Sequence, residues 1–484
     1  MDLTQTPNTQ SNFKNKYNVL TNSNSTPAWA RPIPWAHILL FIIIMATQHI
    51  GIGMAGFGTV GTGVWEALER NSQLISNRAK DAFSLSIKKA AVRDITKKRV
   101  PNAPTSLFTT DWNEVVNDPE VDIVVELIGG TTTAFDIVAA ALKLKKPVVT
   151  GNKALLAERG EELFKISREY NTPIHFEAAV AGGIPVIKAV QDSYVGNRIE
   201  TMSGIINGTS NYILERMTCA GLDYLTALKE AQDLGYAEAD PALDVNGWDA
   251  AHKAILLATL AYGFTIPAED VYVRGIEPVR SIDIDFATQL GYVVKLLSVV
   301  REHEDGSIEL RTQPSFIAKS HILSSVNGVF NAVAVRGDAS GESLFYGRGA
   351  GKEPTASSVV GDLVEAAYTF VHAAGHRGFL PYTDGGKLLP IEETETSYYV
   401  RFEVDDRPGV IAEIANTLAN DGIGISGTHS PVDPENPDKE FRDMVFLLHT
   451  CPFGKLTDTL AKCKALDCVK DEPVVFRIEQ LATS

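Results

Sequence analysis

The chain has 484 residues, 44% of them hydrophobic, and a formal net charge of −16. This length predicts two or three domains, each able to bury a core of its own. The negative charge argues against a nucleic-acid surface, because phosphate neutralisation needs a basic footprint. Neither a metal-ligand spacing nor a dense disulfide framework connects the four cysteines, which predicts a reduced, cytoplasmic protein; they are Cys219, Cys451, Cys463 and Cys468.

Residues 1–44 differ in composition from the rest of the chain. They are rich in Asn, Thr, Ser and Gln and lead into an apolar run at residues 38–46. That run is too short to cross a bilayer, which takes about 20 apolar residues. No small-residue cleavage site separates it from the first expected strand, as a signal peptide would require. We therefore expect a disordered leader, with a membrane tether as the alternative.

A strand, a glycine turn and a helix follow in the order that a dinucleotide-binding fold requires. Residues 50–55 form the expected strand and residues 64–68 mark the helix. The first two glycines of such a turn let the backbone approach a pyrophosphate, and the third lets the helix pack on the strand. The helix N-terminus then faces the phosphates with free N–H groups. The expected phosphate-binding turn comprises Gly56, Phe57, Gly58, Thr59, Val60 and Gly61.

The end of the second expected strand, at residues 85–92, indicates which nucleotide binds. An acidic residue there would bind the ribose of NAD, whereas an arginine favours the 2′-phosphate of NADP. Arg93 holds the position and Lys98 follows closely, although Asp94 is adjacent. The sequence therefore predicts NADP, with NAD also possible. Gly61 and Arg93 are further apart than the usual distance of about 20 residues, so residues 71–81 are expected to extend the helix or form a loop.

Further strands complete this sheet and begin a second one. Residues 121–128 form an apolar run typical of a buried parallel strand. It ends in a polar turn that places Thr131 near a nicotinamide ribose, and a short strand at residues 147–150 leads to Lys153. Alternating segments at residues 308–312 and 331–335 predict a sheet of a second domain. A glycine turn containing Gly351 then returns the chain to the cofactor, before a helix expected over residues 357–373.

Residues 235–253 concentrate charge in a loop that leads into a helix. Asp249 and Lys253 are four residues apart and therefore neighbours on that helix. A charged pair beside an acidic loop suits a small zwitterionic substrate. The alternative is a solvated helix start with an ordinary surface ion pair.

The C-terminal part reads as a linker followed by a small domain. Residues 374–396 carry glycines, prolines and charges without periodicity. Residues 397–480 then show the order β-α-β-β-α-β, the split βαβ arrangement.

Together these motifs resemble homoserine dehydrogenases over about residues 45–375, in the order that the family shows. The resemblance is carried by residues 56–61, 149–153, 177–185, 204–212 and 235–253. It implies NADP-linked interconversion of L-aspartate 4-semialdehyde and L-homoserine. Lys253 would donate the proton, Asp249 would orient it, and Lys153 would contact both cofactor and substrate. Glu238 would bind the substrate's amino group, and Asp244 would line the same pocket.

The resemblance also implies a monovalent cation, sodium, and a regulated assembly. One carboxylate and several carbonyl oxygens suit such an ion better than a transition metal. By position these are Glu177, Val180, Gly182 and Ile184; a simple tight loop is the alternative. The C-terminal unit resembles an ACT domain, which implies an amino-acid effector such as threonine. A homo-oligomer is expected, with neither nucleic acid nor membrane as a partner.

The expected fold class is α/β with three folded domains. A Rossmann-like domain spans residues 45–180 and is completed by about residues 346–373. An α+β catalytic domain spans residues 181–345, and a ferredoxin-like domain follows the linker. Two other functions stay open. Another NAD(P)-dependent oxidoreductase, such as aspartate-semialdehyde dehydrogenase, would need a nucleophilic cysteine, but none precedes Cys219. The other is a non-catalytic amino-acid sensor.

Overall fold

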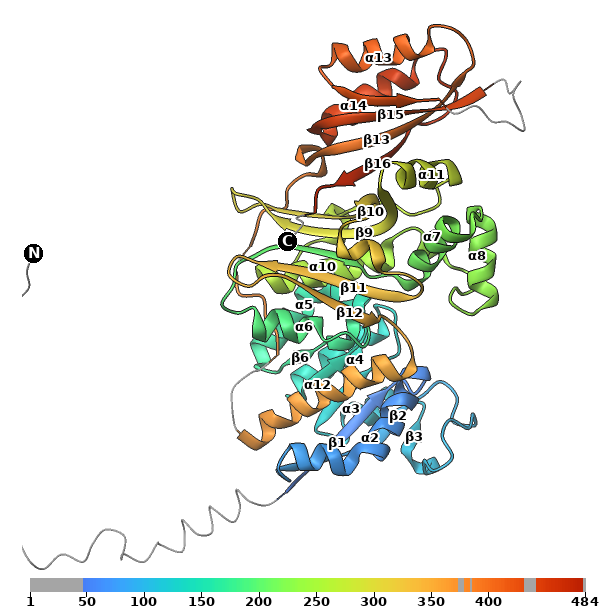
Figure 1. Cartoon of the computed structure of the whole chain (residues 1–484). Coiled ribbons are helices and arrows are strands. Elements are labelled where there is room, and N and C mark those ends of the chain that lie inside the picture. The colour runs from blue at the N-terminus through green and yellow to red at the C-terminus, as the bar shows by residue number, and fades with distance from the viewer. Residues whose placement is uncertain (1–46, 373–377, 384, 431–440, 482–484) are drawn as a thin grey trace, which may run out of the picture. The chain divides into compact units, whose positions relative to one another are not determined.

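The computed structural model describes residues 47–372, 378–383, 385–430 and 441–481 (Figure 1). The chain divides at Thr47, and every described helix and strand belongs to the unit Gln48–Ser484. The expected leader and the first residues of the expected linker, around Gly375, lie outside the described residues.

A six-stranded parallel sheet forms the first domain, in the order β3-β2-β1-β4-β5-β6. Parallel sheets bury both faces under helices, so their strands are apolar throughout; six of the eight residues of β1 are buried. The strands are β1 (Gln48–Ala55), β2 (Phe83–Ala91), β3 (Phe108–Thr109), β4 (Ile123–Glu126), β5 (Val148–Thr150) and β6 (Ile174–His175).

Helices connect these strands and cover the sheet: α2 (Thr59–Arg78), α3 (Trp112–Val116), α4 (Thr133–Lys143) and α5 (Lys153–Tyr170). The long α2 explains why Gly61 and Arg93 are so far apart in the sequence. Helix α12 (Lys352–His372) returns late in the chain and packs on α2 within one hydrophobic core. It begins five residues before the start expected at Ser357, because Pro354 is tolerated in the first turn of a helix.

A second, mixed sheet has ten strands, nine of them in the order β12-β11-β7-β9-β10-β16-β13-β15-β14. The strands that precede the C-terminal part of the chain are β7 (Ile199–Ile205), β8 (Tyr272–Val273), β9 (Tyr292–Glu302), β10 (Ile308–Ala318), β11 (Phe330–Gly337) and β12 (Gly341–Arg348). The associated helices are α6 (Val186–Lys188), α7 (Gly208–Ala220), α8 (Tyr224–Asp233), α9 (Ala242–Val245), α10 (Trp248–Tyr262) and α11 (Ser281–Gln289). The expected alternating segments at residues 308–312 and 331–335 are confirmed as parts of β10 and β11.

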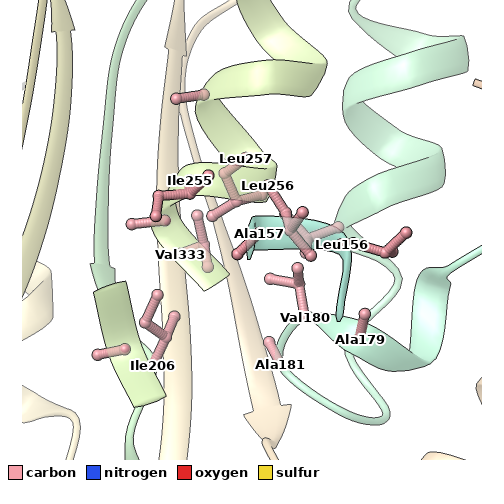
Figure 2. Packing of buried hydrophobic residues seen from close by; sticks show 14 of the residues in the cluster. Leu156, Ala157, Ala179, Val180, Ala181, Ile206, Ile255, Leu256, Leu257 and Val333 are labelled. Atoms are coloured by element: carbon pink, nitrogen blue, oxygen red, sulfur yellow. The ribbon is translucent and has the colours of Figure 1, made fainter. Parts of the chain in front are cut away.

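Helix α10 is the centre of the main core. Apart from Lys253 and Thr259, its buried residues are apolar, which is close to the pattern of a fully buried helix. Figure 2 shows Ile255, Leu256 and Leu257 packed against Leu156 of α5 and Val333 of β11. The helix therefore has little freedom to move relative to either sheet.

The C-terminal module, defined here as residues 395–481, has the predicted β-α-β-β-α-β order. Its elements are β13 (Glu395–Asp405), α13 (Val410–Asn420), β14 (Ile425–His429), β15 (Phe441–Pro452), α14 (Phe453–Lys464) and β16 (Val474–Glu479). The four strands run in the order β16-β13-β15-β14, and both helices contribute to one core on the sheet.

The module continues the second sheet. Strand β16 pairs in parallel with β10 over Ser315–Ile317 and Arg477–Glu479. Beside this pairing the buried Arg311 of β10 donates to both carboxylate oxygens of Glu479, at 2.7 and 2.9 Å, and to Glu309 at 2.6 Å. Such bidentate pairs are strong and geometrically specific. The module is thus joined to the rest of the second sheet by main-chain and buried ionic contacts. Among the described residues, each helix is too short or too polar to span a bilayer.

Candidate active site

The glycine turn has the geometry of a phosphate-binding loop. Gly56 has a φ of +100°, and a Cβ there would lie 2.7 Å from the carbonyl oxygen of Leu127. A Cβ at Gly61 would lie 2.6 Å from the oxygen of Gly56, whereas one at Gly58 would meet no atom of the described residues within 4 Å. The space beside Gly58 and the start of α2 at Thr59 leave room for an anion at the helix N-terminus.

The other residues of the turn either pack into the core or offer main-chain N–H groups. The side chain of Phe57 is buried, and its ring packs edge-on against Phe108 with 5.2 Å between centroids. Phe57 can therefore contribute only its main chain to a nucleotide. Thr59 and Val60 form the first residues of α2, where main-chain N–H groups are free.

Arg93 is exposed directly beyond the carboxyl end of β2. Its neighbour Asp94 accepts from the main-chain N–H and the hydroxyl of Thr96, at 2.8 and 2.6 Å. These hydrogen bonds commit the Asp94 carboxylate to its own turn and, with the hydroxyl bond as the largest cause, lower its pKa. Lys98 is also exposed on this loop. The cationic side chains here are therefore open to solvent, while the acid is engaged locally.

A buried carboxylate that we did not predict shapes the loop after β4. Glu126 accepts from the N–H groups of Ile128 and Gly129, at 2.8 and 3.2 Å, and from the hydroxyl of Thr150 at 2.7 Å. Burial raises its pKa above the ordinary value, against these hydrogen bonds. Asn152 donates to the carbonyl oxygen of Gly130 at 2.7 Å. This network fixes the loop that leads to Thr131, at the carboxyl edge of the sheet.

Two lysines of the predicted substrate site come together around Asp249. Lys253 donates to one Asp249 oxygen at 2.7 Å and to the carbonyl oxygen of Ile206 at 2.8 Å. Lys153, at the start of α5, lies 3.1 Å from the other Asp249 oxygen. The site thus draws on both domains. Lys253 is only 9% exposed, which excludes the alternative of an ordinary surface ion pair.

Electrostatics keep Asp249 ionised. Burial alone would raise its pKa, but the charges of Lys253 and Lys153 outweigh burial and hold the pKa well below the usual range. Asp244 is different, because burial dominates and raises its pKa. The two aspartates therefore have different electrostatic environments within one site.

Asn207 links these two aspartates and was not singled out from the sequence. Its amide nitrogen donates to Asp244 at 2.7 Å and to Asp249 at 2.8 Å, while its oxygen accepts from the N–H of Ser210 at 2.7 Å as the cap of α7. The motif at residues 204–212 was the only available signal. Glu238, by contrast, is exposed on the loop after α8, and within the described residues it forms no ion pair with Lys153 or Lys253.

The loop proposed for a cation is tightly held. Both oxygens of the buried Glu177 accept main-chain N–H groups, from Ile187 at 2.9 Å and Lys188 at 2.8 Å. The carbonyl oxygen of Gly182 accepts from the hydroxyl of Ser358 at 2.7 Å. That of Ile184 accepts from the N–H of Val186 at 2.8 Å, and the N–H of Val180 donates to Glu177. Carbonyl and carboxylate oxygens keep a further lone pair, so the set still fits a weakly charged ion.

Gly351 lies where the chain re-enters the nucleotide-binding domain. It has a φ of +125° and immediately precedes α12. The preceding Gly349 contacts the cation loop, since a Cβ at Gly182 would lie 2.4 Å from its carbonyl oxygen. Any side chain at Gly182 would therefore push its loop away from the segment that contains Gly349.

A parallel sheet with an open glycine turn, linked through Lys153 to the buried Asp249 and Lys253 of a second domain, is the arrangement of a dinucleotide-dependent oxidoreductase. Residues 56–177 match the model of the homoserine dehydrogenase NAD-binding domain, and residues 185–364 match that of homoserine dehydrogenase. The chain belongs to the homoserine dehydrogenase family and is an NAD(P)-dependent enzyme of amino-acid biosynthesis.

Relatives match nearly the whole folded chain. Homoserine dehydrogenase of Pseudomonas aeruginosa is 42% identical over 440 residues, which cover 90% of this chain and 100% of that protein. A crystal structure of a homoserine dehydrogenase from Thiobacillus denitrificans is 41% identical, with a TM-score of 0.83 over 90% of this chain and 99% of that one. A hyperthermophilic archaeal homoserine dehydrogenase, solved with NADPH, is 26% identical with a TM-score of 0.57; it covers 68% of this chain and 100% of that one.

Proposed function

We propose that this homoserine dehydrogenase is NADP-linked, with Lys253 as the proton donor to the alkoxide formed from L-aspartate 4-semialdehyde. The arrangement of Lys253 is the observation that carries the proposal. An ammonium group has three N–H donors, and two of those of Lys253 are used by Asp249 and Ile206. One donor is left for a substrate oxygen, in an orientation that the other two fix.

When bound, the nicotinamide supplies the hydride to the aldehyde carbon. The residues of this chain then complete the reduction by placing a proton on the aldehyde oxygen, which yields homoserine. Lys253 donates that proton, and Asp249 holds its side chain. Lys153 provides positive charge for the substrate carboxylate or carbonyl. Glu238 would bind the substrate's amino group, with Asp244 lining the pocket.

A contact between the loop that carries Glu238 and helix α7 supports this proposed role. The hydroxyl of Thr209, in the first turn of α7, donates to the carbonyl oxygen of Tyr236 at 2.7 Å. This bond ties the loop to the helix that Asn207 caps. A carboxylate on such a loop can approach a substrate that lies against Asp249 and Lys253.

Arg93 supports the preference for NADP. An exposed guanidinium can form two charge-assisted bonds to a phosphate, and Asp94 is engaged with Thr96 instead. The archaeal relative was solved with NADPH, which agrees with this choice.

Sodium bound by Glu177 and the carbonyl oxygens of Val180, Gly182 and Ile184 would hold the loop that touches α12. A comparison of thermal unfolding in sodium chloride and choline chloride tests this proposal. Stabilisation by sodium that Glu177→Gln abolishes is the expected result. Equal stability of the wild type in both salts would contradict it.

The C-terminal module would make the enzyme responsive to an amino acid such as threonine, in a homo-oligomer of the cytoplasm. Gly427 offers a sharp test in the full chain. Among the described residues, a Cβ there would meet only Leu447, at an ordinary 3.5 Å, so an alanine can be accommodated. Gly427→Ala should keep the uninhibited rate of NADPH oxidation and lose inhibition by threonine. Undiminished inhibition would place the effector elsewhere.

A further inference from the structure

The turn between the two site aspartates packs against a short strand of the second sheet. Strand β8 pairs in parallel with β10, with Tyr272 opposite Arg311 and Val273 opposite Thr312. The next N–H group, of Arg274, donates to the carbonyl oxygen of Thr312 at 2.9 Å. Residues 272–274 are therefore fixed to the same strand that pairs with the C-terminal module.

Residues 273–276 directly support the turn between Asp244 and Asp249. The N–H of Ile276 donates to the carbonyl oxygen of Val245 at 2.8 Å. A Cβ at Gly275 would lie 2.2 Å from that same oxygen, and one at Gly247 would lie 3.2 Å from a Val273 methyl group. Because both glycines permit this close approach, a displacement of the strand must displace the turn.

The other side of β8 contacts the module. The Tyr272 ring lies edge-on to Phe453, the first residue of α14, with 5.4 Å between centroids. The guanidinium carbon of Arg477 lies 4.7 Å from the centroid of that Phe453 ring. Successive residues of a strand point to opposite faces, which is why Tyr272 meets the module while Val273 meets Gly247.

We propose that Tyr272 is a positioning residue for the reaction, through which the start of α14 sets the place of Asp244 and Asp249. The amide of Asn207 ties the two carboxylates, so they move together. The inference rests on the proposed roles of Asp249 and Lys253. It predicts an effect on the substrate and not on the cofactor, because the glycine turn and Arg93 belong to the other sheet.

Kinetics of homoserine oxidation with the full chain test the proposal. Tyr272→Ala should raise KM for homoserine by about 3- to 10-fold, as expected for loss of an aromatic pair, and leave KM for NADP⁺ unchanged. Tyr272→Phe keeps the ring and should behave as wild type. Phe453→Ala should raise KM for homoserine to a similar extent. The KM of the double variant should be no higher than that of either single variant, since both substitutions remove the same contact between the two rings.

Two controls separate this effect from instability and from an error in the site. Leu460→Ala removes a buried side chain from the module core two turns further along α14; it should lower the unfolding temperature without changing KM. Lys253→Ala should lose turnover. If it does so while Tyr272→Ala and Phe453→Ala keep wild-type KM values, the positioning role is refuted and the site stands. Turnover retained by Lys253→Ala would refute the site itself. Phe453→Leu preserves bulk and replaces Phe453→Ala if that variant does not fold.

Discussion

Replacement of Lys253 by alanine separates catalysis from stability. The substitution removes two hydrogen bonds, but Asp249 keeps Lys153 at 3.1 Å and Asn207 at 2.8 Å. No buried charge is left unpaired, so the free energy of unfolding should fall by only about 1–3 kcal/mol. Turnover should fall by about 10²-fold or more, because the general acid is gone.

The assay is NADPH oxidation with aspartate semialdehyde, together with NADPH binding and thermal unfolding of each variant. NADPH affinity should stay within a few-fold of wild type, since the phosphate turn lies in the other domain. Lys229→Ala is a matched control, because Lys229 also pairs with an aspartate four residues along a helix, Asp233, but is exposed. Lys229→Ala should change neither the turnover nor the free energy of unfolding. Near wild-type turnover of a folded Lys253→Ala enzyme would refute the reasoning, since the acid must then be elsewhere.

Two further predictions concern the cofactor and the junction with the module. Arg93→Ala should weaken use of NADPH by about 10-fold or more and leave NADH use nearly unchanged; equal losses in kcat/KM would show that Arg93 does not bind the phosphate. Glu479→Gln leaves part of the buried Arg311 charge unpaired and should lower the free energy of unfolding by about 3–5 kcal/mol at pH 7. Burial raises the pKa of Glu479, but Arg311 outweighs burial and holds the pKa below its ordinary value. The stabilisation is therefore complete above the unfolded-state pKa of about 4.3 and is lost progressively as the pH falls from there through the lowered folded-state pKa. Urea titrations at pH 7 and below pH 4 check this; an equal difference at both would contradict it.

Much of this fold could be predicted from local sequence patterns. The order of strand, glycine turn and helix predicted the start of the parallel sheet, and the spacing of Asp249 and Lys253 predicted their contact at 2.7 Å. The β-α-β-β-α-β order of the C-terminal module was also confirmed. Each of these features depends on residues close together in the chain.

Contacts between segments that are distant in the sequence could not be predicted from it. Asn207 binds aspartates 37 and 42 residues away, and nothing local distinguishes it from any other helix cap. The expected linker suggested a separate module, whereas Arg311 and Glu479 form a buried pair across 168 residues. Sequence periodicity reveals which face of a strand is buried, but not which strand lies beside it.

The most direct test of the central claim is the stoichiometry of the reaction of the full chain. Aspartate semialdehyde and NADPH are mixed with the enzyme, and homoserine and NADP⁺ are both quantified. The account predicts one homoserine for each NADPH oxidised, at a rate that Lys253→Ala lowers by about 10²-fold. Tight binding of NADPH without formation of homoserine would contradict it and would favour a sensor.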